Sequence, residues 1–512
     1  MSIETELKLC FSPKDLAVIL QHPLLAAKGK RQKLHNIYYD TPELLLMKQG
    51  IAVRERKILR RLLLTVKMNQ TNVSGLSQRL EWEAPTIHGQ FDFQTLIEDP
   101  TLAEKMTLLA PQLIPIFTTD FTRHSWEMTY RGAVIEVAID QGQVMTKRGE
   151  ALFEEAICEV ELELKTGSPV TLYGLARVLS RGVRLHPSAA SKAERGYKLF
   201  KGIEHKPIKP PSMTVDPHAA PLVTFERIAL ECLNHLQVND IGVVQDTDDE
   251  YIHQARVAMR RIRSAIKLFS PVLPEAFVSQ WNGIWRDYAN VLGAARNWDV
   301  FLYETFVQLK QAFPNHPEIA ALEMYAKEQR LQAHQKVVTT FGSRSYSVHC
   351  ISFAEASMNL PHHPVIKNRL KIIAQSQATS EPITEENTQE FATRLLKRQH
   401  RRFMREVMVP HRNLEESHHL RLDLKKVRYS FDFFLNLFPK KGITAFIKTL
   451  ARAQVLLGDM NDLATAEALL KTRQLSQPDI AHAWIIGRQS AYMLMMPYVI
   501  SELKHLKAPW KG

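Results

Sequence analysis

The chain has 512 residues, 45% of them hydrophobic, so it is long enough to bury more than one core, and we expect two domains. Its four cysteines lie far apart, which excludes a disulfide framework or a zinc knuckle and favours a reducing, cytoplasmic compartment. The net charge of +12 favours an anionic partner: nucleic acid, a membrane surface or free phosphates.

The two ends of the chain carry no export or membrane signal. The first ten residues include two glutamates where a secretory signal needs basic and then apolar residues. The longest apolar run near the C-terminus is interrupted by Arg488 and Pro497. We therefore expect a soluble protein with no membrane partner.

The first 200 residues are predicted to be mostly strands, because several segments alternate polar and apolar residues with a period of two. These segments are Ile3–Leu9, Leu62–Lys67, Arg79–Glu83, Val134–Asp140 and Ile157–Leu164. Two other segments, Pro13–Leu25 and Leu172–Gly182, have a helical pattern.

One face of each predicted strand carries an unusual density of charge. In the first strand Glu4, Glu6 and Lys8 share a face, because side chains alternate along a strand. The later strands repeat the pattern with Arg54 and Arg56, Thr65 and Lys67, Glu81 and Glu83, Glu136 and Asp140, and Glu159, Glu161 and Glu163. A single such strand is usually an ordinary solvated face. Repeated like charges need counter-ions, so a barrel with these faces inside could hold a metal cation and a polyanion together.

This ordered set resembles the triphosphate tunnel metalloenzymes, or CYTH family, over roughly residues 1–200. The resemblance rests on the charged strands above, on Arg123, and on the segment Ser191-Lys192-Ala-Glu-Arg-Gly-Tyr197. It implies an antiparallel eight-stranded tunnel that binds triphosphate compounds with Mg²⁺ or Mn²⁺. Family activities include inorganic, thiamine and RNA triphosphatases and adenylate cyclase.

The resemblance also implies a set of site residues. The catalytic group is Glu4, Glu6 and Lys8. The phosphate-binding group is Lys8, Arg54, Arg56, Lys67, Arg123 and Lys192. Hard divalent cations prefer oxygen ligands, and the expected metal ligands are Glu4, Glu6, Glu159, Glu161, Glu163 and Asp140. For Asp140 and Glu83 a salt-bridge role is an equal alternative.

The middle of the chain changes character. Prolines at 207, 210, 211 and 217 predict a linker at residues 204–220, between a first domain at 1–203 and a helical domain at 221–512. Residues 1–200 hold 26 of the 66 basic and 23 of the 54 acidic residues, so the later part holds 40 basic residues against 31 acidic. The excess positive charge therefore belongs mainly to the helical half.

The helical half contains an internal repeat with an offset of 165 residues. Its basic motif beginning at His253 recurs at His418, and Phe269 recurs as Phe434. The Leu292-Gly293 pair likewise recurs as Leu457-Gly458. At about 100° per residue the basic positions share an arc of roughly 80°, so each copy lays a basic stripe along one helix. The neighbouring arc is the expected core face: Ala255, Met259, Ile262, Ile266 and Phe269.

This pattern resembles the CHAD domain, a histidine-containing helical bundle associated with inorganic polyphosphate, over about residues 215–510. A solvated basic face is the alternative for either helix alone. The expected polyphosphate-binding residues are His253, Arg256, Arg260, Arg263, His418, Arg421, Lys425 and Arg428. A further basic helix is expected at Phe391–Met408. The acidic residue expected after Tyr429 is not obvious, and Asp432 is its candidate replacement.

The sequence therefore predicts an α+β protein: an antiparallel eight-stranded β-barrel tunnel with flanking helices, then an all-α bundle of two duplicated halves. The favoured function is metal-dependent hydrolysis of inorganic triphosphate to diphosphate and phosphate, with polyphosphate bound by the second domain. The alternatives are adenylate cyclase, an organic (thiamine or nucleoside) triphosphatase, and a non-catalytic polyphosphate-binding protein. Nucleic acid is a less favoured partner of the basic helices.

Overall fold

The computed structural model describes residues 2–188, 190–245, 248–362, 386–410, 413–473, 479–506, 508 and 510. These residues form two compact units. One comprises the chain up to Lys206 together with Gly342–Asn359, and the other comprises Pro207–Phe341 and the chain from Leu360 onward. All four cysteines are free, as expected. Among the described helices, none combines the length and apolar composition that a membrane crossing requires.

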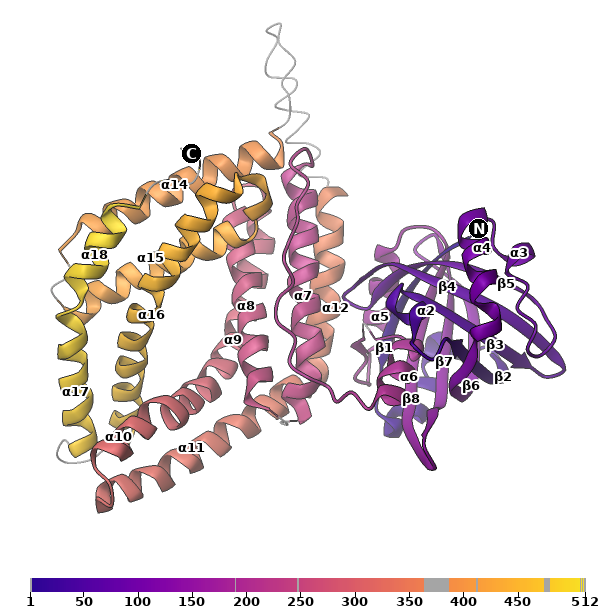
Figure 1. Cartoon of the computed structure of the whole chain (residues 1–512), viewed down its shortest axis with the longest axis horizontal. Helices are drawn as coiled ribbons and strands as arrows, with labels where there is room; N and C mark the ends of the chain where they lie inside the picture. The colour runs from indigo at the N-terminus through magenta and orange to yellow at the C-terminus, as the bar shows by residue number, and fades with distance from the viewer. Residues whose placement is uncertain are drawn as a thin grey trace, which may run out of the picture. The chain divides into compact units, whose positions relative to one another are not determined.

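The first unit is a closed antiparallel barrel of eight strands (Figure 1). The strands lie in the order β5-β4-β3-β2-β6-β7-β8-β1, and β1 also pairs with β5, which closes the ring. A two-residue strand β9 (His186–Pro187) pairs with the end of β1. The barrel strands are β1 (Ser2–Cys10), β2 (Lys30–Asp40), β3 (Ile51–Ile58), β4 (Arg61–Val73), β5 (Leu76–Pro85), β6 (Ile114–Tyr130), β7 (Ala133–Arg148) and β8 (Ala151–Thr166).

The barrel has its charged residues inside and its apolar residues outside, under the flanking helices, as the sequence predicts. On strands β3 to β5 the apolar residues Val53, Leu64, Val66 and Leu80 are buried in a cluster with residues of three helices, one before β3 and two after β5. These helices are α2 (Leu45–Lys48), α3 (Phe93–Leu96) and α4 (Pro100–Leu109). Because strand side chains alternate, covering the apolar face turns the charged face into the lumen.

Helix α6 (Lys192–Lys201) packs against β6, β7 and β8. It begins at a capping box in which Ser191 and Glu194 satisfy each other's backbone amides, which fixes where the helix starts. A Cβ atom on Gly196 would lie 2.2 Å from the ring of Phe117. The missing side chain lets the helix approach the barrel closely enough for Lys192 to reach the lumen.

Two expectations about smaller elements need comment. The segment Pro13–Leu25 is not one helix: it divides into η1 (Pro13–Asp15), α1 (Leu16–Leu20) and η2 (Pro23–Leu25), because Pro23 cannot continue a helix. The other expected helix is confirmed as α5 (Val170–Leu179). Residues 203–220 form no helix or strand.

The second unit is helical. The two copies of the basic motif lie on α8 and α15, and the two Leu-Gly pairs lie on α9 and α16. The rings of Phe269 and Phe434, which the repeat relates, lie 5.9 Å apart in the core. The helices of this unit are α7 (Pro221–Gln245), α8 (Asp249–Phe269), α9 (Glu275–Val300), η4 (Phe301–Thr305), α10 (Phe306–Ala312), α11 (Pro317–Phe341), η5 (Leu360–His362), α14 (Thr388–Met408), α15 (Leu414–Asp432), η6 (Leu435–Leu437), α16 (Lys440–Lys471), α17 (Ile480–Met493) and α18 (Met496–Lys504).

Helix α12 (Arg344–Asn359) lies within the expected helical domain 221–512 in sequence, but it belongs to the barrel unit. Its residue Glu355 accepts hydrogen bonds from Arg131 Nη1 at 3.2 Å and from Arg177 Nε on α5 at 2.9 Å. Two turns earlier on the same face of α12, Ser347 Oγ lies 3.1 Å from His186 Nδ1 on β9. Only these tertiary contacts assign α12 to the barrel unit, because the periodicity of its sequence does not indicate its partners.

We predict that a fragment ending at Lys206 is less stable than the same unit in the whole chain, because it loses α12 and uncovers α5. Ile351 lies between Ser347 and Glu355 on the same helix face and is fully buried, and such a side chain contributes about 1.5–3 kcal/mol. The fragment should melt at a lower temperature and bind a hydrophobic dye. Fusing residues 342–359 to it should reverse both effects, and a fragment that melts normally without dye binding would contradict this role of α12.

Candidate functional site

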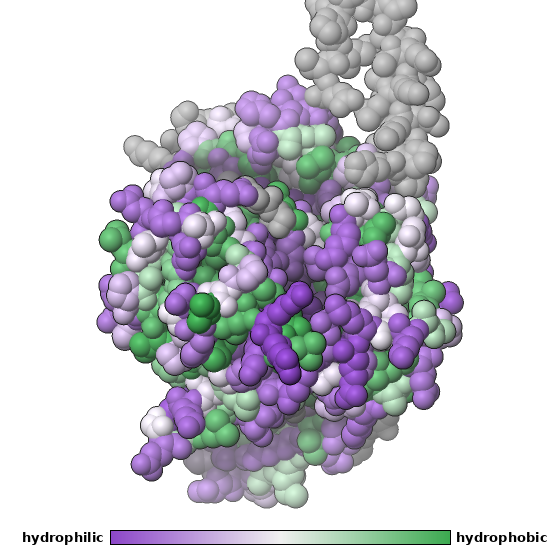
Figure 2. Space-filling view, turned by 90° about the vertical axis from the view of Figure 1, so that its right-hand side faces the viewer, coloured by the Kyte–Doolittle hydropathy of each residue, from purple (hydrophilic) through white to green (hydrophobic). Residues whose placement is uncertain are grey.

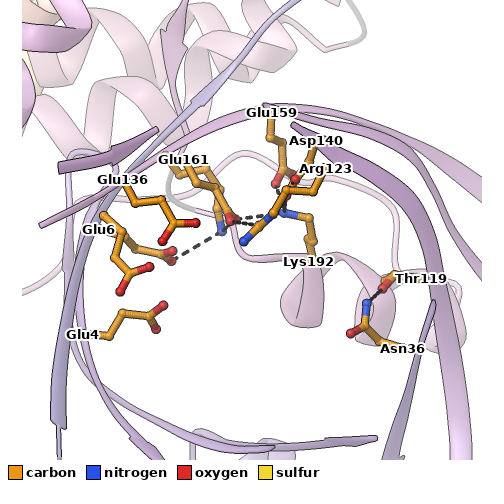
Figure 3. A network of polar contacts seen from close by, with 12 residues as sticks. Glu4, Glu6, Asn36, Thr119, Arg123, Glu136, Asp140, Glu159, Glu161 and Lys192 are labelled. Carbon is orange, nitrogen blue, oxygen red and sulfur yellow. Dashed lines mark hydrogen bonds and ion pairs between the residues drawn. The ribbon is translucent and has the colours of Figure 1, made fainter. Parts of the chain in front are cut away.

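The barrel encloses a cavity of ≈ 760 Å³ whose lining is mainly charged. Hydrophilic side chains gather across the middle of the face of the barrel seen in Figure 2, with hydrophobic ones to either side. In close view, Glu4, Glu6, Glu136 and Glu161 project toward one another, and Arg123 and Lys192 lie beside Glu161 (Figure 3). The lining thus brings both signs of charge into one space.

Strand register explains why these residues meet. Glu6 of β1 lies opposite Glu163 of β8, and Lys8 lies opposite Glu161. On the other side of β8, Glu163 lies opposite Glu136 of β7. Directly paired residues of an antiparallel ladder point to the same face, so the three strands align their charged positions in rows along the lumen.

The deepest part of the network is centred on Lys192. Its Nζ lies 2.8 Å from Asp140 Oδ2, from Glu159 Oε2 and from Glu161 Oε1. Arg123 donates to both oxygens of Asp140, at 2.8 and 2.6 Å, and to Glu161 at 2.5 Å. Two cations thus pair with three carboxylates, of which Asp140 and Glu159 are fully buried.

These contacts decide the charge states. Burial lowers the pKa of Lys192, but Asp140, Glu159 and Glu161 outweigh burial and hold the pKa well above its usual value. Burial raises the pKa of Glu161, but Lys192 and Lys8 outweigh it and hold that pKa well below its usual value. Both groups are therefore charged over the ordinary pH range.

One region of the lumen has an excess of positive charge. Arg56 Nε donates to the neutral amide oxygen of Asn36 at 3.0 Å. Burial, together with the neighbouring cations Arg54 and Arg123, lowers the pKa of Arg56 to about 10. A guanidinium whose pKa falls because of other cations lies in a positive potential, and an anion would stabilise it.

Another region has an excess of negative charge. Burial raises the pKa of Glu163, and Glu4 and Glu136 raise it further. Lys165 offsets this repulsion in part, with its Nζ 2.6 Å from Glu163 and 3.2 Å from Glu136. Grouped carboxylate oxygens of this kind suit Mg²⁺ or Mn²⁺, so the donor set fits the expected metal ions.

The structure separates the expected site residues into two groups. Every expected phosphate-binding and catalytic residue lines the cavity, as do the expected metal ligands Glu4, Glu6, Glu161 and Glu163. Asp140 and Glu159 do not appear in that lining and are fully buried. Their carboxylates pair with the cations Arg123, Lys192 and Arg195, the last at 2.5 Å from Glu159.

Several lining residues were missed by sequence reasoning. They include Tyr38, Arg79 and Lys165. Arg79 lies two residues before Glu81 and Lys165 two residues after Glu163, so each shares a strand face with a predicted lumen residue. The alternation of side chains along the strand could therefore have identified both. Tyr38 had no charge pattern to identify it. Burial raises the pKa of its phenol, but Arg54, Arg56 and Lys192 outweigh burial and lower it.

A second charged surface lies in the helical unit, where α8 and α15 meet. The guanidinium of Arg260 on α8 lies 4.7 Å above the ring of Tyr429 on α15. Burial lowers the pKa of Lys425 to about 7, and Arg421, Arg260 and Arg256 add to the effect. The two basic stripes therefore form one shared surface rather than two separate ones.

The expected residues at the ends of the two stripes have neighbours of their own: two arginines contact neutral amide side chains, and two histidines lie beside further cations. Arg263 lies 3.5 Å from the side chain of Asn282, and Arg428 donates to Gln454 at 2.6 Å. Burial lowers the pKa of His253, and Arg296 is among the cations that lower it further. Burial and Arg421 likewise lower the pKa of His418.

Among the described residues, Asp249, Asp299 and His334 bring possible metal-ligand atoms within 4.8 Å of one another. Arg330 pairs with both carboxylates, through Nε at 2.8 Å in the case of Asp299. The guanidinium thus occupies the place of a cation, and the group is an ion-pair network that ties α8, α9 and α11 together.

Comparisons with known proteins agree with this geometry. Residues 2–197 match the CYTH domain, and residues 227–471 match the CHAD domain. An inorganic triphosphatase from Haemophilus influenzae is 37% identical over 204 residues, which are 38% of this chain and 54% of that protein, so the chain spans about half of that relative's length. The CHAD domain of the plant Ricinus communis covers 60% of this chain and 99% of its own at 24% identity, with a TM-score of 0.50, and it supports the helical fold.

We predict that Lys192→Met destabilises the barrel in a pH-dependent way. At neutral pH it leaves three buried carboxylates without their shared cation, which should cost about 3–5 kcal/mol. The lowered pKa values of Asp140 and Glu161 mean that their ion pairs contribute stability above the unfolded-state values near pH 4 and lose it as pH falls through the folded-state values. The defect should therefore shrink at acid pH.

Hydrogen exchange of β7 and β8, measured in the presence of a metal chelator, reports this local stability. Lys201→Met removes an exposed charge from the other end of the same helix and is the matched control. Equal protection in both variants, or a defect that does not vary with pH, would contradict the central role of Lys192.

Proposed function

Because this chain contains a CYTH domain followed by a CHAD domain, we propose that its barrel hydrolyses inorganic triphosphate to diphosphate and phosphate with Mg²⁺ or Mn²⁺. The main support is the division of the lumen into a positive region around Arg54 and Arg56 and a negative region around Glu4, Glu136 and Glu163. A chain of phosphates fits the first region and its metal ion fits the second. The similarity to the Haemophilus inorganic triphosphatase points the same way.

The basic residues of the lumen act by charge rather than by proton transfer. Burial lowers the pKa of Lys8, but Glu6 and Glu161 outweigh burial and raise it, and the pKa of Lys192 is raised further still. Both amines stay protonated and can neutralise the charge that builds on the phosphoryl oxygens. Arg54, Arg56 and Arg123 add planar donors, which match two phosphate oxygens at once.

The carboxylates divide the remaining work. Glu4, Glu6, Glu161 and Glu163 face the cavity and would hold the metal, whereas Asp140 and Glu159 keep Arg123 and Lys192 in place. A bound divalent cation supplies charge neutralisation for the phosphates and acidifies a bound water. A carboxylate of the acidic group would accept the proton of the attacking water while the basic residues hold the substrate in line.

The substrate is proposed to be inorganic because most residues that line the cavity are charged, and they come from all the barrel strands except β2, which contributes Tyr38. Phosphate release from tripolyphosphate, ATP and thiamine triphosphate, each with Mg²⁺ and Mn²⁺, tests this choice. Faster turnover of an organic triphosphate, or cyclic AMP formed from ATP, would favour the organic triphosphatase or the cyclase. No turnover of any of them would favour a non-catalytic, polyphosphate-binding protein.

We predict that Glu6→Gln and Lys8→Ala each reduce tripolyphosphate hydrolysis by about 10³-fold, since each removes a preorganised charge from the transition state. Phosphate release under saturating substrate and metal measures the loss. Lys33→Ala is a suitable control, because Lys33 is 75% exposed on β2 and pairs with Asp120. Turnover of either lumen variant close to that of the control would overturn the assignment of the tunnel as the active site.

We also propose that the helical unit binds inorganic polyphosphate at the surface shared by α8 and α15. Buried Nε atoms of Arg260 and Arg421 have no hydrogen-bond partner among the described residues, and neighbouring cations help to lower the pKa of Lys425. Burying unpaired donors and repelling cations is costly, and an extended polyanion would supply the missing acceptors. Asp462 is a nearby carboxylate that offsets part of this repulsion.

We predict that Arg256→Gln combined with Arg421→Gln weakens long-chain polyphosphate binding by about tenfold or more at low salt. The slope of the logarithm of the binding constant against the logarithm of the salt concentration should become shallower by roughly one to two. Titration calorimetry at several salt concentrations measures both. Lys310→Gln combined with Lys327→Gln removes the same charge from exposed positions that pair with Glu323 and is the control. Equal slopes in the two double variants would show that the basic stripes are a solvated face. Competition with DNA and RNA identifies a nucleic acid partner.

A further inference from the structure

The carboxylate of Glu6 is held through one of its two oxygens. Arg79 Nη1 on β5 donates to Glu6 Oε1 at 2.9 Å, and Ser77 Oγ donates to the same oxygen at 3.2 Å. The Nζ of Lys8 lies 3.7 Å from that oxygen as well. Three groups thus converge on Oε1, and none of these contacts involves Oε2.

Register makes this arrangement rigid. Ser77 is the residue of β5 directly opposite Glu6, and Arg79 is opposite Glu4. Both therefore approach Glu6 from the wall that closes the barrel. The side chains of Arg79 and Glu6 are only 8% and 6% exposed, so little water competes for the ion pair.

Glu4, two residues away on the same face, is held differently. Its Oε2 lies 2.6 Å from Lys67 Nζ, and Lys67 also lies 3.3 Å from Glu81. The lysine side chain is 17% exposed, twice as much as that of Arg79. Lys67 can exchange a carboxylate for an incoming phosphate, whereas Arg79 donates to Glu6 through Nη1 from a side chain that is only 8% exposed.

We propose that Arg79 is a positioning residue that fixes the rotation of the Glu6 carboxylate, so that Oε1 stays on the β5 wall and Oε2 faces the reacting groups. This inference rests on the proposed triphosphatase function. It makes the two glutamates of the first strand unequal: Glu6 is preorganised by Arg79 and Ser77, whereas Glu4 gains its freedom when substrate draws Lys67 away. Arg79 itself does not bind phosphate.

The test compares kcat and KM for tripolyphosphate in Arg79→Met, Arg79→Lys and Ser77→Ala. Misplacing a reacting group by about an ångström costs roughly 10²-fold in rate, so Arg79→Met should lower kcat by about that factor with KM nearly unchanged. Arg79→Lys should recover part of kcat because one donor still reaches Oε1, and Ser77→Ala should give a smaller loss of the same kind. Arg61→Met, at an exposed position on β4, is the control.

A higher KM with unchanged kcat would make Arg79 a phosphate ligand and overturn the proposal, as would wild-type kinetics in Arg79→Met. If Arg79→Met does not fold, Arg79→Lys and Ser77→Ala test the proposal by the same criterion, a lower kcat with KM nearly unchanged. A crystal structure of Arg79→Met, or of Ser77→Ala if Arg79→Met does not fold, gives an answer that does not depend on activity. An unchanged orientation of the Glu6 carboxylate in that variant would overturn the proposal. Failure of the wild-type chain to hydrolyse tripolyphosphate would instead contradict the proposed function.

Discussion

The barrel depends on one constraint: a charged side chain that is buried in the wall of the lumen needs an opposite charge beside it, because little water reaches it. The ammonium of Lys192 among Asp140, Glu159 and Glu161 meets that constraint at the deepest point. Removing charges from water is costly, and the cost is offset only where geometry is nearly ideal. Helix α6 supplies that geometry, since its capping box and Gly196 place Lys192 where the three carboxylates converge.

The same constraint separates supporting groups from working groups. Asp140 and Glu159 are saturated by cations and lie behind the cavity, so they keep Arg123 and Lys192 in place. Toward the open part of the lumen the balance is incomplete: Arg56 lies among cations, and Glu163 lies among carboxylates. Incomplete balance of both signs in one cavity is what a metal-bound polyanion would complete.

The helical unit shows the same principle on a surface where cations outnumber the nearby carboxylate of Asp462. Its two repeats bring Arg260, Arg421 and Lys425 onto a surface shared by α8 and α15, where mutual repulsion and burial lower the pKa of the lysine. An extended anion would relieve this repulsion. Duplication thus supplies a continuous basic surface that neither copy carries alone.

The sequence by itself indicated the strands, their inverted polarity and most of the charged residues that line the cavity, because alternation along a strand is a local property that the segments around Glu4, Glu159 and Arg54 display directly. The closed eight-stranded barrel was implied by the resemblance to the CYTH family. The sequence also located the duplicated basic motif and its core face, which includes Phe269. It could not assign α12 to the barrel unit, distinguish Asp140 from Glu161, or show that Arg79 holds Glu6 by one oxygen. Those distinctions depend on which residues meet across strands and helices far apart in the chain, and only tertiary packing decides which carboxylates are saturated by cations and which face the cavity.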